Sequence, residues 1–167
     1  TGDVSGTDNV GGIVGFGWGI DVTNSHASGD VTGSSGVGGL IGQIFGDVTN
    51  SYATGDVSGS SAYLGGLIGF LDGNVSGSHS QNSLTSIGDF VGGLVGQADG
   101  NVSNSYARTT ISSSTDFSDR VGGLVGHALC SISNSYAVVA GDINSYSYAG
   151  GLVGQADSSI TDSYSLV

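Results

Sequence analysis

The sequence predicts an all-β protein, specifically a β-solenoid of about six coils, and three observations lead to this fold class. First, a pentad with the pattern Gly-Gly-apolar-apolar-Gly recurs at residues 11–15, 38–42, 65–69, 92–96, 122–126 and 150–154. Second, the stretches between pentads are short and rich in β-branched residues, which favour strands, and Gly, Asn and Asp at their ends favour turns. Third, 33 of the 167 residues are Gly, and strong helix formers are scarce.

The pentads divide the chain into repeat units, which together form one predicted domain over residues 1–167. The units are 10–36, 37–63, 64–90, 91–120 and 121–148, each 27 to 30 residues long, with partial units at 149–167 and 1–9. We expect about three short strands per unit: the pentad, a stretch such as DVTNSYA at 47–53, and a third stretch centred on an apolar residue. The centres of the third stretches are Val4, Val31, Val57, Leu84, Ile111 and Ile143.

Strands this short cannot bury an apolar side alone, so the units are expected to stack and align their apolar residues in rows along one axis. Two such rows are Val22, Val48, Val75, Val102, Ile132, Ile160 and Val10, Val37, Leu64, Val91, Val121, Ala149. The alternatives are a β-propeller, whose blades need about 40 residues, and a β-sandwich, which would not repeat one motif in register six times.

The charge of the chain excludes several function classes. The chain has 14 acidic and 2 basic residues, a formal net charge of −12. A nucleic-acid-binding protein needs basic residues to displace counterions, so this class is excluded. No apolar run approaches about 18 residues, so no membrane span is expected. Only Arg108 and Arg120 would be cut by a trypsin-like protease, which favours an extracellular or cell-surface location, and the single Cys130 cannot form an internal disulfide.

The repeat resembles a known family. VGGLVG at 91–96, followed by NVSNSYA at 101–107 and a GDVSG-like stretch, is similar to the GLUG-motif repeat of secreted and surface proteins of bacteria and archaea. The resemblance implies stalk or spacer parts and brings no catalytic residues. Unit 64–90 departs most from the pattern, with Gly77 in place of Asn, and an insertion at 113–119 predicts a loop.

The two partial units fit each other, because 149–167 joined to 1–9 would make one unit as long as 121–148. Both ends carry ordinary strand sequence without a polar cap, so we expect copies to assemble head to tail into an extracellular filament. The interface residues would be Thr1, Gly2, Asp3, Val4, Ile160, Tyr164, Leu166 and Val167. Alternatively, the chain is a fragment of a longer surface stalk or adhesin that binds glycan, mineral or ice.

The pentad also predicts a lateral contact between solenoids. Adjacent residues of a strand point to opposite faces, so one of the two apolar pentad rows should face outward. The candidate lateral interface is the row Val14, Ile41, Ile68, Val95, Val125 and Val153.

Two further surface features are predicted. Asp3, Asp30, Asp56 and Asp142 occupy one position of the repeat, where they are either solvated turn residues or ligands of calcium, the only cofactor that the pattern suggests. Asn74 and Asn101 stand in glycosylation sequons.

Three polar or aromatic rows complete the repeat. The row Asn24, Asn50, Asn104, Asn134 predicts either an amide ladder or left-handed turns. The row Ser25, Ser51, Ser78, Ser105, Ser135, Ser163 predicts a hydroxyl that fits one tight place in every coil. The row His26, Tyr52, His79, Tyr106, Tyr136, Tyr164 is either packed inside or at a corner, or exposed as a stripe for glycans or another filament. No pattern of catalytic residues is visible, so the chain is not expected to be an enzyme.

Overall fold

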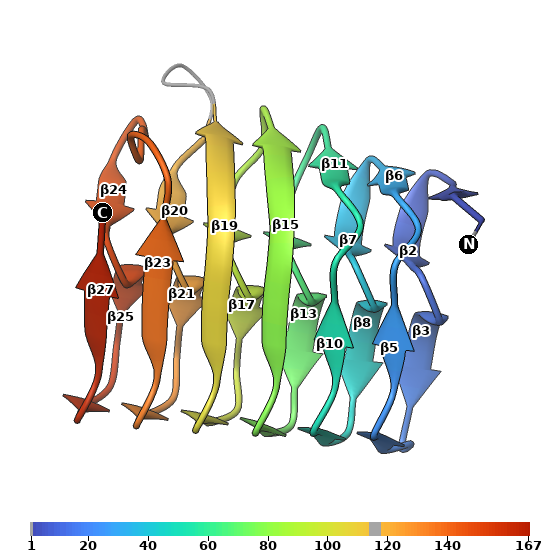
Figure 1. Ribbon diagram of the computed structural model, residues 1–167, viewed down its shortest axis with the longest axis horizontal. Coiled ribbons are helices and arrows are strands. Elements are labelled where there is room, and N and C mark those ends of the chain that lie inside the picture. The colour runs from blue at the N-terminus through green and yellow to red at the C-terminus, as the bar shows by residue number, and fades with distance from the viewer. Residues whose placement is uncertain (1, 114–117) are drawn as a thin grey trace.

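The computed structural model describes residues 2–113 and 118–167, and throughout these residues it contains strands and no helix. The strands stack as about six parallel coils, which confirms the predicted β-solenoid. Figure 1 shows the coils side by side along the long axis, with the N-terminal coil (blue) and the C-terminal coil (red) at opposite ends. Most of the loop predicted at 113–119, and Thr1, lie outside the described residues. No described helix could cross a membrane.

One sheet, which we call sheet A, forms the face seen in Figure 1. Its main strands are β1 (Val4–Ser5), β6 (Val31–Gly33), β11 (Val57–Gly59), β15 (His79–Ser86), β19 (Tyr106–Ser113), β23 (Tyr136–Val139) and β27 (Tyr164–Leu166). β5 (His26–Ala27) and β10 (Tyr52–Ala53) extend the same sheet beside the first half of β15. Ile143, predicted to centre a strand, lies outside any strand, because the chain turns at Gly141 with a φ of 97°.

Three further sheets, B, C and D, complete each coil. Sheet B contains β2 (Asp8–Gly11), β7 (Ser35–Gly38), β12 (Leu64–Gly65), β16 (Val91–Gly92), β20 (Arg120–Gly122) and β24 (Tyr148–Gly150). Sheet C contains β3 (Val14–Trp18), β8 (Ile41–Phe45), β13 (Ile68–Asp72), β17 (Val95–Ala98), β21 (Val125–Ala128) and β25 (Val153–Ala156). Sheet D contains β4 (Val22–Thr23), β9 (Val48–Thr49), β14 (Val75–Ser76), β18 (Val102–Ser103), β22 (Ile132–Ser133) and β26 (Ile160–Thr161).

The register of the strands agrees with the predicted rows. Val22 pairs with Val48, and the pairing continues without a slip through Val75, Val102, Ile132 and Ile160. The row that starts at Val10 is in register in the same way. The coil nevertheless has four sheets where we expected about three strands, because the pentad is not one strand.

Each pentad bends between its second and third residues, so that it ends a strand of sheet B and begins a strand of sheet C. The N–H groups of Ile13 and Val14 both donate to the carbonyl of Leu40, at 2.9 and 3.2 Å. Two consecutive donors on one acceptor mark a bulge-like bend, in which neighbouring side chains can point the same way. Both apolar pentad residues therefore enter the core.

The predicted lateral interface is consequently wrong. In the interior coils, the core holds four members of the row, fully buried: Ile41, Ile68, Val95 and Val125. Val14 and Val153, in the end coils, are partly buried and pack against the same core. The alternation rule on which the prediction rested applies to straight strands, and the pentad is bent.

The pentad glycines lie where two backbones come close together. A Cβ on Gly93 would collide with the carbonyl oxygen of Gly123 in the next coil and would lie 2.9 Å from the Cβ of Ala107 in sheet A. A Cβ on Gly42 would lie 2.5 Å from the carbonyl carbon of Asn9 and 2.6 Å from the oxygen of Gly15. Glycine is required here for close approach, and not for an unusual φ.

The serine row forms a continuous hydrogen-bond ladder, which confirms the tight place predicted for these hydroxyls. Ser78 N–H donates to Ser105 Oγ (3.2 Å), and Ser105 N–H donates to Ser135 Oγ (3.2 Å). Each hydroxyl in turn donates to the carbonyl two residues earlier, as Ser105 does to Ser103 (2.7 Å). The same pattern runs from Ser25 to Ser163. These hydroxyls are therefore structural.

We expect Gly93→Ala to destabilise the solenoid by about 1–3 kcal/mol or more, because the new methyl group would have to displace the backbone of Gly123 and the side chain of Ala107. The measurement is a thermal or denaturant transition followed by circular dichroism. Gly2→Ala is the control, since a Cβ there would meet no atom within 4 Å. Equal stability of the two variants would contradict the close-approach argument.

We expect Ser105→Ala to cost about 1–3 kcal/mol, because it leaves the buried N–H of Ser78 without its acceptor and removes one of the two donors to the carbonyl of Ser103. Ser112→Ala, an exposed serine of the same coil, should leave the transition nearly unchanged. A loss no larger than that of Ser112→Ala would show that the ladder contributes little.

Candidate functional site

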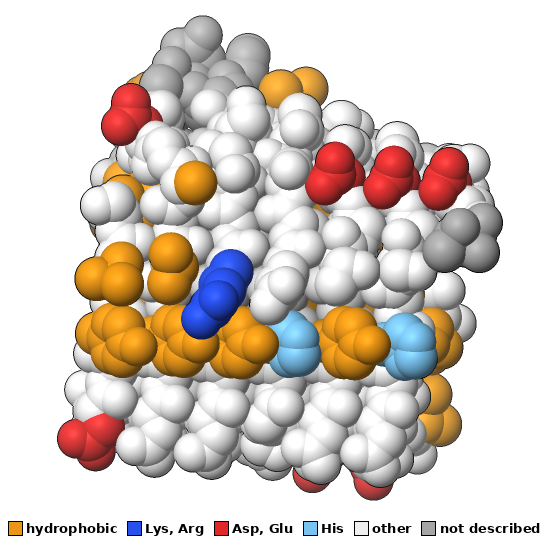
Figure 2. Space-filling view, viewed as in Figure 1, with side chains coloured by type: hydrophobic (Ala, Val, Ile, Leu, Met, Phe, Trp, Pro, Cys, Tyr) orange, Lys and Arg blue, Asp and Glu red, His pale blue; other side chains and the backbone are white. Residues whose placement is uncertain are grey.

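The outer face of sheet A carries a row of stacked rings, which we call the aromatic ladder. Its members are His26, Tyr52, His79, Tyr106, Tyr136 and Tyr164, and the row crosses the face shown in Figure 2. Neighbouring centroids lie 4.6–5.2 Å apart, with ring planes 4–8° from parallel. The sequence left open whether this row is packed inside or exposed. In the structure it lies at the surface, where the four inner rings are half-buried and His26 and Tyr164 are exposed. Each ring covers its neighbours' faces, so the ladder presents ring edges.

Partial burial lowers the pKa of His79, and the positive charge of Arg108 in the next coil lowers it further. The His79 ring therefore stacks between Tyr52 and Tyr106 as a neutral imidazole at neutral pH.

The predicted acidic row supports the backbone. Asp3, Asp30 and Asp56 are exposed. Figure 2 shows acidic side chains in a line at the N-terminal end of this face. Asp30 N–H donates to the carboxylate of Asp3 (3.1 Å), and Asp56 N–H donates to that of Asp30 (2.9 Å). Asp142 lies in the irregular segment after β23. Within residues 2–113 and 118–167, no three His, Cys or acidic side chains form a group that could hold a metal ion, and calcium stays a prediction.

A second ladder of this kind includes both predicted glycosylation residues. Asn74 N–H and Nδ2 donate to Asp47 Oδ1, at 2.8 and 3.1 Å. Asn101 makes the same pair of bonds to Asn74 Oδ1, at 3.2 and 3.1 Å. Both asparagines are exposed, but their amide nitrogens already have partners in the ladder.

The asparagine row adopts the left-handed conformation that was one of its two predicted roles. Asn24, Asn50, Asn104 and Asn134 have φ between 47° and 50°, and Asp162 and Gly77 occupy the same position with φ of 48° and 58°. The amide ladder exists, but it is formed by Asn74 and Asn101 of the neighbouring row.

Sheets B and C carry a second aromatic surface, which we call the aromatic band. It consists of Phe16, Trp18, Phe45, Phe70, Tyr63 and Phe90. Consecutive rings have centroids 4.6–6.0 Å apart, and most pairs are tilted by 41–72°. Trp18 is 71% exposed and Phe16 is 53% exposed. The band thus runs across several coils and reaches the N-terminal end.

Two members of the aromatic band have a strained backbone. Tyr63 and Phe90 have φ of 61° and 57°, while Asn9 and Gly36 occupy the same position in the first two coils, with φ of 52° and 61°. Asn and Gly adopt this conformation easily, whereas a bulky residue there costs on the order of 1–3 kcal/mol.

Sequence analysis did not single out the aromatic band, although a signal was present. Phe16 and Phe70 follow the second apolar residue of their pentads by two positions, and Phe45 by four. Counting by twos from the buried pentad residue would place these rings in the core. In the structure they instead alternate with the buried Gly17, Ile44 and Leu71, and so they lie on the outer face.

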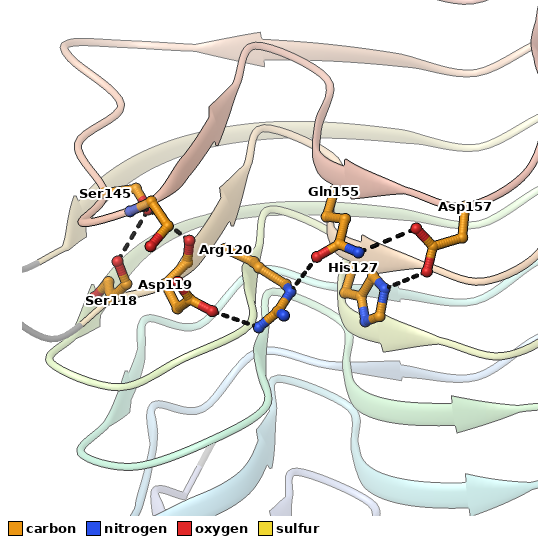
Figure 3. Close-up of polar contacts among 8 residues, drawn as sticks. Ser118, Asp119, Arg120, His127, Ser145, Gln155 and Asp157 are labelled. Carbon is orange, nitrogen blue, oxygen red and sulfur yellow. Dashed lines mark hydrogen bonds and ion pairs between the residues drawn. The ribbon is translucent and has the colours of Figure 1, made fainter.

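Polar groups continue the aromatic band toward the C-terminal end (Figure 3). The Arg120 guanidinium lies over Phe90 (4.8 Å) and Tyr148 (5.5 Å), and its Nε donates to Gln155 Oε1 (2.5 Å). Another of its nitrogens bonds Asp119 (2.5 Å).

Asp157 accepts hydrogen bonds from its neighbours in the same network. Gln155 Nε2 lies 3.0 Å from Asp157 Oδ1, and His127 Nε2 lies 3.0 Å from Asp157 Oδ2. The bond from Gln155, followed by that from His127, lowers the pKa of Asp157. These contacts link the polar side chains into one network, which lies beside the aromatic band.

The end coils expose residues that the interior coils bury. Ile13 is 52% exposed, whereas Leu40 and Leu67 in the same row are fully buried. At the other end Ile160 is 43% exposed, while its partner Ile132 is 1% exposed. Of the predicted interface residues, Gly2, Asp3, Ile160, Tyr164, Leu166 and Val167 are exposed and Val4 is half-buried.

Comparison with known proteins agrees with this repeat geometry. The comparisons with curated proteins and with solved structures each found no match. The family model described as the GLUG motif matches residues 6–32, 33–58, 91–112, 118–144 and 145–167. It passes over 59–90, which contains the unit that departs most from the pattern. Because these matches cover more than half of the chain, the protein belongs to the GLUG-motif family.

Proposed function

We propose that the chain is a structural subunit of an extracellular filament, in which the last coil of one copy stacks on the first coil of the next. The observation that carries the proposal is the register of the repeat, in which equivalent apolar residues pair from Val22 to Ile160 without a slip. Another coil of the same kind would continue every apolar row. The net charge of −12 and the scarcity of Arg support an extracellular location.

The two end faces also complement each other in hydrogen bonding. Within the chain, each ladder serine donates its N–H to the hydroxyl of the next coil. The C-terminal face therefore presents a donor, Ser163 N–H, and the N-terminal face presents an acceptor, Ser25 Oγ. Tyr164 and His26 stand at the matching ends of the aromatic ladder, and Tyr–His stacking already occurs between Tyr52 and His79 (5.0 Å).

The energetics are of the required order. About four half-exposed apolar side chains on each face of a junction would contribute roughly 6–12 kcal/mol if they became fully buried. Association costs about 4–15 kcal/mol. The apolar contacts alone roughly balance this cost, so the parallel strand pairing across the junction would decide the affinity.

We expect Ile160→Asp to abolish assembly, because it places a charge in the centre of the junction. The measurement is light scattering after size exclusion, with negative-stain electron microscopy. The variant should keep its circular dichroism spectrum, since Ile160 is already partly exposed, whereas Ile132→Asp in the interior should unfold. A wild-type chain that stays monomeric at high concentration would contradict the filament and favour a spacer within a longer chain.

The filament should repeat along its axis at about 29 Å, which is six coils at the ~4.8 Å spacing of neighbouring strands. Fibre diffraction or helical reconstruction measures this repeat. A repeat near 50 Å would exclude coil-on-coil stacking.

A further inference from the structure

The outer face of sheet C alternates rings and amides along the solenoid axis. In register, the row consists of Phe16, Gln43, Phe70, Gln97, His127 and Gln155. Neighbouring strands lie ~4.8 Å apart, so a ring recurs at about 9.6 Å, with an amide between each pair of rings. This regular alternation of apolar and hydrogen-bonding groups is a linear array on a surface.

Two rings of the aromatic band that lie beside this row, Tyr63 and Phe90, have a strained backbone. Tyr63 packs against Phe70 with centroids 5.6 Å apart and against Phe90 at 5.0 Å. Both Tyr63 and Phe90 occupy a left-handed position that Asn9 and Gly36 fill without strain. Folding alone favours Asn or Gly there, so the rings point to a use at the surface.

The orientation of the rings distinguishes the aromatic band from the aromatic ladder. In the ladder, parallel rings cover one another's faces. In the band, Phe45 is tilted by 57° to Phe16 and by 46° to Phe70, so ring faces are left partly open to solvent. A ligand that stacks on ring faces can therefore use the band and not the ladder.

The acidic groups near the aromatic band and the net charge of the chain favour a neutral partner over an anionic one. Among the acidic groups beside the band, Asp99, Asp119 and Asp157 are bonded to Gln97, to Arg120, and to Gln155 and His127, whereas Asp72 pairs in register with Phe45 and is exposed. The net charge of −12 would repel a polyanion.

We propose that the aromatic band binds a neutral linear glycan of β-linked sugars, a function beyond that of the filament subunit. The rings would stack on the apolar faces of sugars, and the amide of Gln43 and the Oε1 atom of Gln97 would bond to hydroxyls, since the other amide atoms of Gln97 and Gln155 are used within the chain. In a chain whose successive sugars are turned over, every second sugar presents the same face, which matches a ring in every second coil.

The test is affinity electrophoresis of the full chain in gels that contain hydroxyethyl cellulose, galactomannan or, as a polyanion, alginate. We expect a neutral polysaccharide to retard the wild type. Tyr63→Asn and Phe70→Gln, which insert residues that other coils carry at the same positions, should weaken this binding at least tenfold. Tyr136→His is the matched control, because the ladder accepts His at two of its positions, and it should bind as the wild type does.

Each result supports or overturns the proposal. Tyr63→Asn should melt at or above the wild-type temperature, so a loss of binding reports the missing ring and not unfolding. Absence of retardation by both neutral polysaccharides, stronger retardation by alginate, or unchanged binding of both variants would overturn it. Loss of self-association in Tyr63→Asn without glycan binding would also overturn it, and would assign the band to contacts between copies. Ile160→Asp should still bind glycan, which separates this outcome from that of the filament proposal.

Discussion

The close approach of backbones at the pentad is the constraint on which the rest of the structure depends. Gly93 lies against the carbonyl of Gly123 and against Ala107 of sheet A, so no side chain fits between them. This contact draws successive coils together and allows the bend that turns both apolar pentad residues inward. A core of Leu, Ile and Val can then fill a narrow coil of four short sheets.

Repetition makes each coil both donor and acceptor for its neighbours. Ser105 receives an N–H from one coil and gives its own to the next, and Asn74 and Asp30 do the same on the outer surface. Such ladders can continue through any number of coils, because the last coil always has an N–H donor or a side-chain acceptor that a further coil could pair. The unpaired donors and acceptors of an end coil are therefore a property of the repeat itself.

The sequence was sufficient to predict which residues align in rows, but not whether their side chains point into the core or outward. The row from Val22 to Ile160 and the serine ladder follow from counting residues between pentads, because a parallel coil places equivalent residues side by side. The direction of Ile41 could not be predicted, since it depends on two N–H groups sharing one carbonyl at the bend. The contact between Tyr63 and Phe70 was missed for the same reason, because only the bend brings residues seven positions apart to one surface.

The division between inner and outer positions explains where a repeat protein of this kind can acquire a specific function. Inner positions tolerate little variation, because each is repeated against a backbone or a packed row. The position one residue before the row that runs from Val10 to Ala149 in sheet B varies freely. It holds Asn9, Gly36, Tyr63, Phe90, Arg120 and Tyr148 in successive coils. At this position two coils accept a strained backbone to hold a ring, although asparagine would fold more easily. A residue that lowers stability at a surface position points to binding of a partner there. This distinguishes the aromatic band from the ladders, which only hold the coils together.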